Sequence, residues 1–204
     1  MPTVATPSTS PRRGRPGYDQ ESVLQIAVTV FNRHGYDATS MGMLAEELGV
    51  SKSAIYHHVP SKGDLLRLAL DEALVPLEAI GDAAQAQGGS TIERLEYTLR
   101  STIRVLLDRQ PYVTLLLRLR GNTEVERNAL DRRRAVDRRV TDLMVAAQAE
   151  GRIRADVEPR TTTRLMFGMI NSLVEWYRPG GPATPEQVEE NAIAMIVDGL
   201  RARD

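Results

Sequence analysis

Apolar residues along this chain recur with the roughly 3.6-residue period of an α-helix. The first such face is made by Val23, Ile26, Ala27, Val30 and Phe31. A glycine follows at position 35, where a helix commonly ends. No segment shows sustained alternation of apolar and polar residues, which would indicate a half-buried strand. The pattern therefore predicts an all-α protein.

Two short helices joined by a tight turn are predicted next. The first covers residues 41–48, and either Thr39 or Ser40 can cap its start. The Gly-Val-Ser sequence at residues 49–51 breaks the helical period, and its serine can cap a second helix over residues 52–58. The spacing gives two helices of about two turns each on either side of a glycine-containing turn.

Six further segments with helical periodicity fill the rest of the chain, for a total of about nine helices. The first begins at Ser61, carries apolar residues as far as Leu77, and contains Pro76, which is expected to kink it. The others cover residues 92–107, 112–119, 124–150, 160–177 and 184–201. No internal repeat relates them.

These elements divide the chain into three parts. Residues 1–17 are rich in proline, serine, threonine and arginine with almost nothing to bury, so a flexible basic arm is expected there. Residues 18–64 form a three-helix unit that contains the two short helices. Residues 65–204 form a larger helical domain.

Composition narrows the classes of protein that fit this pattern. The 204 residues include no cysteine, which excludes disulfide bonds and thiolate metal sites and suits a reducing cytoplasm. No apolar run approaches the roughly 20 residues of a membrane span, and the first residues lack the apolar stretch of a signal peptide. A cytoplasmic protein without a membrane partner is therefore expected. The net charge of −1 does not suggest a nucleic-acid binder, so basic residues have to be considered by position.

The second short helix has one apolar and one polar face. Val50, Ala54, Ile55 and Val59 supply the inward face. The opposite face carries Lys52, Ser53, Tyr56 and His57. In a helix-turn-helix the second helix enters the major groove while the first braces it, so this face is a candidate for DNA contact.

The stretch from Ala38 to Leu66 resembles the signature of the TetR family of transcriptional regulators. The resemblance extends over about fifty residues from Ile26 past Leu66 and rests on the spacing of Thr39, Ala45, Gly49, Val50, Ser51, Ala54, Tyr56, Lys62, Leu65 and Leu66. Two positions depart from the family pattern: Gly63 stands where an acidic residue is common, and Val59 where phenylalanine is common. Both departures concern packing, because neither position touches DNA in the family.

The resemblance implies roles for individual residues on double-stranded DNA. Phosphate contacts are implied for Ser40, Tyr56, His57 and Lys62, whereas Ser51, Lys52 and Ser53 would reach base edges or the sugar-phosphate backbone. The arm residues Arg12, Arg13 and Arg15 can enter an adjacent minor groove. The alternative for the arm is that it is disordered and does not contact DNA. For an exposed residue such as Lys52 or His57, considered alone, the alternative is that its side chain is only solvated.

Two other charged or metal-binding candidates have simpler explanations. His57 and His58 are adjacent on a helix and point about 100° apart, so they do not suit one metal ion, and no metal or cofactor is expected. The basic run at residues 131–139, DRRRAVDRR, is interpreted mostly as the solvated face of a long helix. Binding of nucleic acid or an acidic partner by this run is the alternative.

The last two long helices, residues 160–177 and 184–201, are the predicted homodimer interface. In the regulators that this chain resembles, the corresponding helices pair with their mates. A two-fold dimer also places two recognition helices about one DNA turn (~34 Å) apart, as a near-palindromic operator requires. The alternative is that these apolar faces only close an internal core.

A ligand pocket is expected among the middle helices, although core packing is the alternative for each candidate. The apolar and polar candidates are Tyr97, Tyr112, Leu116, Met144, Phe167, Asn171 and Trp176. The sequence Trp-Tyr-Arg-Pro-Gly-Gly at residues 176–181 resembles the same region in regulators of fatty-acid, steroid and aromatic-acid catabolism, some of which sense CoA thioesters. The basic arm also resembles regulators of phenylacetate degradation. Arginines that would then hold CoA phosphates are Arg118, Arg120, Arg164 and Arg178.

The resulting hypothesis is a dimeric repressor that binds a palindromic operator and is released by a small molecule, such as an acyl-CoA or aryl-CoA thioester. A regulator that responds to drugs or other hydrophobic ligands is the alternative. An acyl-CoA enzyme is disfavoured because the three histidines, His34, His57 and His58, all lie in the first 64 residues, and no nucleophile motif accompanies them. The sequence does not distinguish a repressor from an activator.

Overall fold

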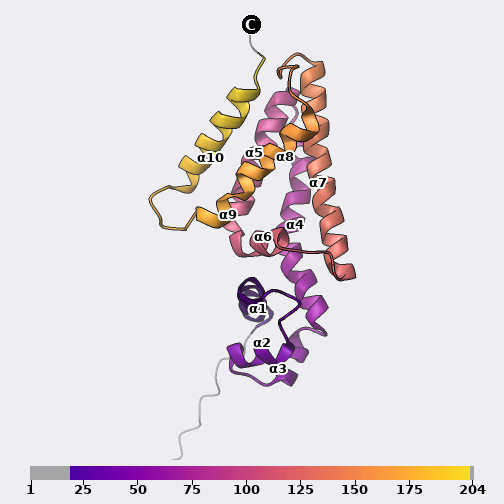
Figure 1. Cartoon of the computed structure of the whole chain (residues 1–204), viewed down its shortest axis with the longest axis vertical. Coiled ribbons are helices and arrows are strands. Elements are labelled where there is room, and N and C mark those ends of the chain that lie inside the picture. The colour runs from indigo at the N-terminus through magenta and orange to yellow at the C-terminus, as the bar shows by residue number, and fades with distance from the viewer. Residues whose placement is uncertain (1–18, 203–204) are drawn as a thin grey trace, which may run out of the picture.

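The computed structural model describes residues 19–202, and these residues fold almost entirely into helices (Figure 1). The order is α1 (Gln20–His34), α2 (Met41–Leu48), α3 (Lys52–His58), α4 (Lys62–Gln87), α5 (Thr91–Asp108), α6 (Gln110–Leu117), α7 (Glu124–Ala149), α8 (Pro159–Asn171), α9 (Leu173–Trp176), α10 (Pro185–Ile193) and a π-helical turn (Ala194–Asp198). The predicted all-α fold is confirmed. The expected arm, with Arg12, Arg13 and Arg15, lies outside the described residues.

The first three helices form a small unit at one end of the molecule (Figure 1). The hydroxyl of Ser40 accepts the Met43 N–H at 3.2 Å at the start of α2, and that of Ser51 accepts the Ala54 N–H at 3.2 Å at the start of α3. Gly49, between the two helices, has a φ of 64°, a conformation that glycine adopts without a steric penalty. Thr39, the other candidate cap, is buried and instead donates to the Gly35 carbonyl.

Helix α4 joins this unit to the rest of the protein. It begins at Lys62, is capped by Ser61, whose hydroxyl accepts the Asp64 N–H, and runs without interruption past Pro76 to Gln87. The boundary expected between residues 64 and 65 therefore lies inside a continuous helix. This one helix thus belongs both to the larger part and to the packing of the first three helices.

Helices α4, α5 and α7 form the centre of the larger part, with α6 and α8 packed against them and α10 along the outer side of α5 (Figure 1). Two charged clusters connect these helices. Arg132 on α7 contacts Asp71 at 2.6 Å and Glu78 at 2.7 Å on α4. Arg132 is thus part of the packing between two helices and not of the solvated face expected for residues 131–139.

The second cluster holds α10 against α5. The buried carboxylate of Glu189 accepts hydrogen bonds from Arg100 at 3.0 Å and from Arg104 at 2.6 Å. These bonds lower the pKa of Glu189 even though burial raises it. Because the carboxylate is shielded from water and paired with two arginines, it fixes the position of α10 on the bundle.

The C-terminal helices are less regular than predicted. Residues 160–177 form two helices, and the break occurs at Ser172, whose hydroxyl donates to the Met169 carbonyl at 2.7 Å. Such bonding of a serine to its own helix backbone bends helices. Residues 184–201 continue from α10 into the π-helical turn. Within residues 19–202, no helix is long and apolar enough to cross a membrane.

Candidate DNA-contacting surface and effector site

The predicted DNA-contacting residues on α2 and α3 lie together on the exposed end of the molecule. Ser51, Lys52, Ser53 and His57 are exposed, and Tyr56 retains 49% of its surface. Ile55 on the opposite side of α3 is fully buried. Helix α3 therefore presents the polar face that the sequence predicts, and the cap residue Ser40 of α2 is exposed beside it.

Lys62 has a structural contact that the sequence did not indicate. Its ammonium group donates to the carbonyls of Tyr36 at 3.0 Å and of Thr39 at 2.8 Å, and it lies 4.3 Å from the centre of the Tyr36 ring. These contacts join the start of α4 to the loop that follows α1. An ammonium group has three donors, so one remains for a phosphate.

Helix α6 connects the larger domain to α1 at both of its ends. The amide of Asn32 in α1 donates to the Pro111 carbonyl at 2.8 Å, and Arg118 donates to the Asn32 carbonyl at 3.1 Å. In the loop that follows α6, Asn122 donates to Asp37 at 2.6 Å. Arg118, a predicted ligand residue, thus bonds to α1, and its guanidinium also lies 4.0 Å from the carboxylate of Glu175 in α9.

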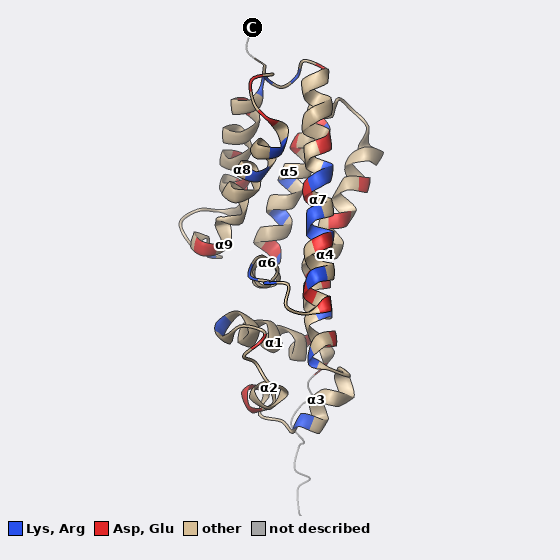
Figure 2. Cartoon of the chain, turned by 45° about the vertical axis from the view of Figure 1, so that its right-hand side comes forward, with Lys and Arg blue, Asp and Glu red and all other residues tan. Residues whose placement is uncertain are grey.

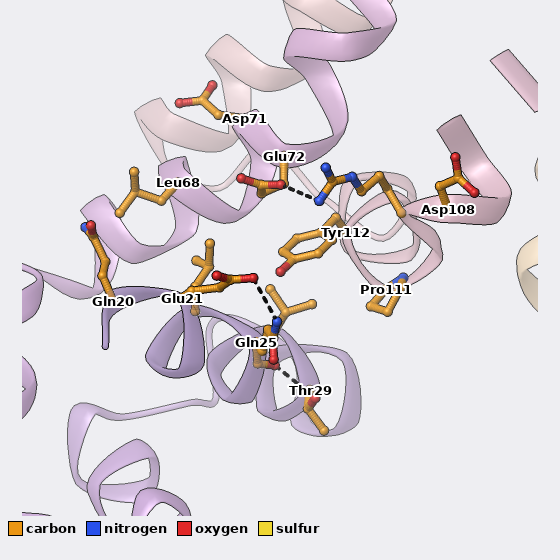
Figure 3. A pocket seen from close by; sticks show the side chains of 13 residues that line it. Gln20, Glu21, Gln25, Thr29, Leu68, Asp71, Glu72, Asp108, Pro111 and Tyr112 are labelled. Atoms are coloured by element: carbon orange, nitrogen blue, oxygen red, sulfur yellow. Dashed lines mark hydrogen bonds and ion pairs between the residues drawn. The ribbon is translucent and has the colours of Figure 1, made fainter. Parts of the chain in front are cut away.

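A cleft of about 680 Å³ lies between α1 and the helices α4 and α6 (Figure 3). Tyr112, another predicted ligand residue, lines this cleft. The pKa of its hydroxyl is raised, mainly because the group is buried and in addition because the carboxylate of Glu72 is nearby. Glu72 is itself paired with Arg109 at 2.8 Å. The cleft thus lies between the three-helix unit and the larger part of the protein.

A small cavity of about 40 Å³ lies inside the larger domain. Its apolar walls come from α4, α5, α6, α7 and α8, with Leu77, Thr102, Leu106, Val113, Leu116, Leu117, Val136 and Phe167. Arg133, Asp137 and Asn171 complete the lining. Of the predicted ligand residues, Leu116, Phe167 and Asn171 meet here.

An open groove of about 760 Å³ runs between α7 and α8, and it shares Arg133, Asp137, Phe167 and Asn171 with the cavity. The shared residues make the cavity the inner end of the groove. Arg134, Arg138, Arg160 and Arg164 also line the groove, and both helices carry basic positions (Figure 2). Burial raises the pKa of Asp137, and the neighbouring arginines oppose this effect. Only Arg164 of these arginines was a predicted ligand residue.

The remaining predicted ligand residues lie elsewhere. Met144 is fully buried in the core, and Tyr97 on α5 lines neither the cavity nor the groove. Arg120 is exposed in the loop before α7. The guanidinium of Arg178 donates to the carbonyls of Tyr177 and Glu175, so it closes the end of α9 and is directed away from the cavity.

An apolar surface covers the outer side of α8, α9 and α10 with the π-helical turn that follows it. Its exposed members are Leu165 at 68%, Met169 at 38%, Trp176 at 55% and Met195 at 67%. A depression of about 680 Å³ between these helices is lined by Met169, Trp176 and Met195. We call these four residues the α8–α10 face. Trp176, predicted to contact ligand, lies here and not in the cavity.

Two family models match the chain. "Bacterial regulatory proteins, tetR family" matches residues 23–69, and "Tetracyclin repressor-like, C-terminal domain" matches residues 88–200. The chain is 48% identical to a solved member of the TetR transcriptional regulator family from Streptomyces coelicolor A3, with a TM-score of 0.82 over 98% of this chain and 95% of that one.

Two further similarities are more distant. The repressor KstR2 of Mycolicibacterium smegmatis is 25% identical over 91% of this chain and 92% of its own length. AibR, solved with isovaleryl coenzyme A and operator DNA, shares the fold with a TM-score of 0.72 at 22% identity over 87% of this chain and 97% of AibR.

Proposed function

Because this chain belongs to the TetR family of bacterial transcriptional regulators, we propose that it is a repressor that binds a palindromic operator as a homodimer and is released by a CoA thioester. The observation that carries this proposal is the connection between its two sites. Helix α6 lines the cavity with Val113 and Leu116, and both of its ends are hydrogen-bonded to α1. We assign operator contact to the unit formed by α1, α2 and α3 and call it the DNA-contacting unit. The protein would act in the cytoplasm, where the operator lies.

Operator contact is assigned to the exposed face of α3. Lys52, with the hydroxyls of Ser51 and Ser53, would reach base edges, and Ser40, Tyr56, His57 and Lys62 would bind phosphates. Phosphate contacts supply affinity that is independent of sequence, whereas base contacts select the operator. The arm with Arg12, Arg13 and Arg15 would add a minor-groove contact.

The α8–α10 face is assigned to the contact between two copies of the chain. An exposed cluster of large apolar side chains is costly in water, and a second copy would cover it by two-fold symmetry. The arrangement also agrees with the requirement for two α3 helices on one operator.

A CoA thioester is favoured as the effector for two reasons. AibR, which shares the fold, was solved with isovaleryl coenzyme A together with operator DNA. In addition, the cavity of this protein is apolar at its inner end and opens into a groove lined by arginines, which suits an apolar group joined to an anionic one. An uncharged hydrophobic ligand would leave those arginines without a partner.

Release would follow from movement of α4 and α6. Leu77 on α4 and Leu116 on α6 both line the cavity, which is smaller than an acyl group of several carbons. A ligand that binds best after these helices move apart shifts the population toward that state. Since α4 continues into the DNA-contacting unit and α6 is bonded to α1, the spacing of the two α3 helices in the dimer would change.

The test is an electrophoretic mobility shift with DNA from the promoter of the protein's own gene. Titration with isovaleryl-CoA, phenylacetyl-CoA and longer thioesters should release the DNA, whereas the matching free acids should not. Absence of a sequence-selective shift would refute the repressor. A shift that persists with every thioester but disappears with an uncharged hydrophobic ligand would refute the CoA assignment.

A further inference from the structure

Four of the five arginines that line the α7–α8 groove make no hydrogen bond from their guanidinium groups within the described part of the chain, whereas the fifth, Arg134, is paired with Asp131 at 2.8 Å. No carboxylate or carbonyl within residues 19–202 accepts a hydrogen bond from the guanidinium groups of Arg133, Arg138, Arg160 or Arg164. Among the other arginines of the same range, only Arg120 and Arg152 share this property. Most unpaired guanidinium groups of the described chain are thus gathered in one groove. The carboxylate of Asp137 offsets part of this charge, but the groove lining holds five arginines and only two aspartates, so its net charge is positive and favours an anion.

Asp137 occupies the point where the groove meets the cavity, and its carboxylate also makes no hydrogen bond within the described residues. Arg133 and Asn171 lie at the same junction, and the apolar walls of the cavity begin behind them. A ligand that enters the cavity from the groove must therefore pass beside one acidic side chain.

We propose that the groove and Asp137 divide the recognition of the effector. The unpaired arginines bind the phosphate-bearing end of a CoA thioester, and Asp137 excludes the free carboxylic acid from the cavity. This inference rests on the proposed function, since it concerns the same effector. It replaces Arg118, Arg120 and Arg178 as phosphate contacts and retains Arg164.

The chemistry of the two ligand ends explains this division. CoA carries several phosphate charges on one end, and guanidinium groups bind phosphates through paired, charge-assisted hydrogen bonds. The thioester at the other end is neutral, so it can lie beside a carboxylate. A free acid places a second carboxylate at this position, and two like charges close together in a partly buried site repel each other.

The first experiment measures binding of CoA and of adenosine 3′,5′-bisphosphate to the full-length protein by calorimetry. The double variant Arg138→Gln/Arg164→Gln should bind both probes about 100-fold more weakly, since each charge-assisted contact accounts for about tenfold. The matched control is Arg152→Gln, which removes an unpaired arginine outside the groove and should bind as the wild type does. Equal affinity in the double variant and the wild type, or no saturable binding of either probe to the wild type, would overturn the phosphate assignment.

The second experiment tests Asp137 with the thioester that releases DNA and with the matching free acid. In Asp137→Asn the free acid should bind about tenfold more tightly, while the affinity for the thioester changes little. The matched control is Glu124→Gln, an exposed acidic residue of the same helix that lines neither the groove nor the cavity. Unchanged discrimination in Asp137→Asn, or the same change in Glu124→Gln, would overturn this part.

Failure of the inference is distinguishable from failure of the proposed function. If the wild type does not bind operator DNA selectively, the proposed function fails whatever the calorimetry shows. If a thioester releases the DNA but the groove variants respond as the wild type does, the proposed function stands and the inference fails.

Discussion

The side-chain amide of Asn32 in α1 donates a hydrogen bond over 2.8 Å to the carbonyl of Pro111 in α6, 79 residues further along the chain. The same residue accepts a hydrogen bond from Arg118 at the other end of α6 through its own carbonyl. Asn32 thus connects the helix that lines the cavity to the unit that carries α3. Substitution of Asn32 therefore tests whether the effector site is coupled to the DNA-contacting unit.

The variant Asn32→Ala should uncouple effector binding from DNA release. Loss of one hydrogen bond should lower the free energy of unfolding by about 1 kcal/mol. The concentration of thioester needed for half-release should rise, because movement of α6 is transmitted less completely to α1. Urea unfolding and a mobility-shift titration measure the two effects. Asn128→Ala, in which an exposed amide on α7 is removed, serves as the control; equal release concentrations in both variants would contradict the coupling.

Lys62 should contribute to both stability and DNA affinity. The variant Lys62→Met removes hydrogen bonds to the carbonyls of Tyr36 and Thr39, and this should lower the free energy of unfolding by about 1.5–3 kcal/mol. It should also reduce the slope of log affinity against log salt by about 1, because one phosphate contact is lost. Thermal unfolding and fluorescence anisotropy at several salt concentrations measure these effects. A stable variant with an unchanged salt slope would argue against both roles.

Tyr56→Phe provides a contrasting change on the same surface. The exposed hydroxyl makes no hydrogen bond within the described residues, so its removal should leave stability unchanged. Operator affinity should fall about tenfold through loss of a phosphate hydrogen bond. The salt slope should stay constant, since tyrosine carries no charge. Anisotropy on operator and on unrelated DNA measures this, and affinity equal to that of the wild type would remove Tyr56 from the contact surface.

Glu189 should make stability depend on pH at the acidic end. Because its pKa is lowered in the folded state, its contribution is complete above the unfolded value near 4.5 and is lost as the pH falls through the folded value. The variant Glu189→Gln should be less stable at neutral pH by about 1–3 kcal/mol, and this difference should shrink toward about pH 3. Urea unfolding across this range measures it. The exposed neighbour Glu190 supplies the control Glu190→Gln, for which a difference of the same size would contradict a specific role of Glu189.

Replacement of an apolar residue on the α8–α10 face by a charge should separate the dimer. Leu165→Arg should convert the protein to a monomer in analytical ultracentrifugation, because a buried unpaired charge in the interface is strongly unfavourable. Operator affinity should fall as well, since a monomer contacts one half-site. Val145 on α7 is 51% exposed and lies outside this face, so Val145→Arg should remain dimeric. A dimeric Leu165→Arg would assign the interface elsewhere.

The sequence by itself determined the local features of this protein. The starts of α2 and α3 at Ser40 and Ser51 and the break at Gly49 follow from hydrogen bonds and backbone conformations within a few residues. The buried and exposed faces of α3 follow from the helical period in the same way. For this reason the helix-turn-helix unit could be located residue by residue before any packing was known.

Only the tertiary structure decided which distant side chains meet. Among the predicted phosphate-binding arginines, Arg118 and Arg178 satisfy backbone carbonyls, whereas Arg164 lies in a groove with Arg133 and Arg138 of another helix. A basic residue at a helix surface has the same local pattern whether it faces solvent, a carboxylate or a cavity. The relative rotation of α7 and α8 determines which of these environments each arginine has. That rotation depends on how the whole core packs.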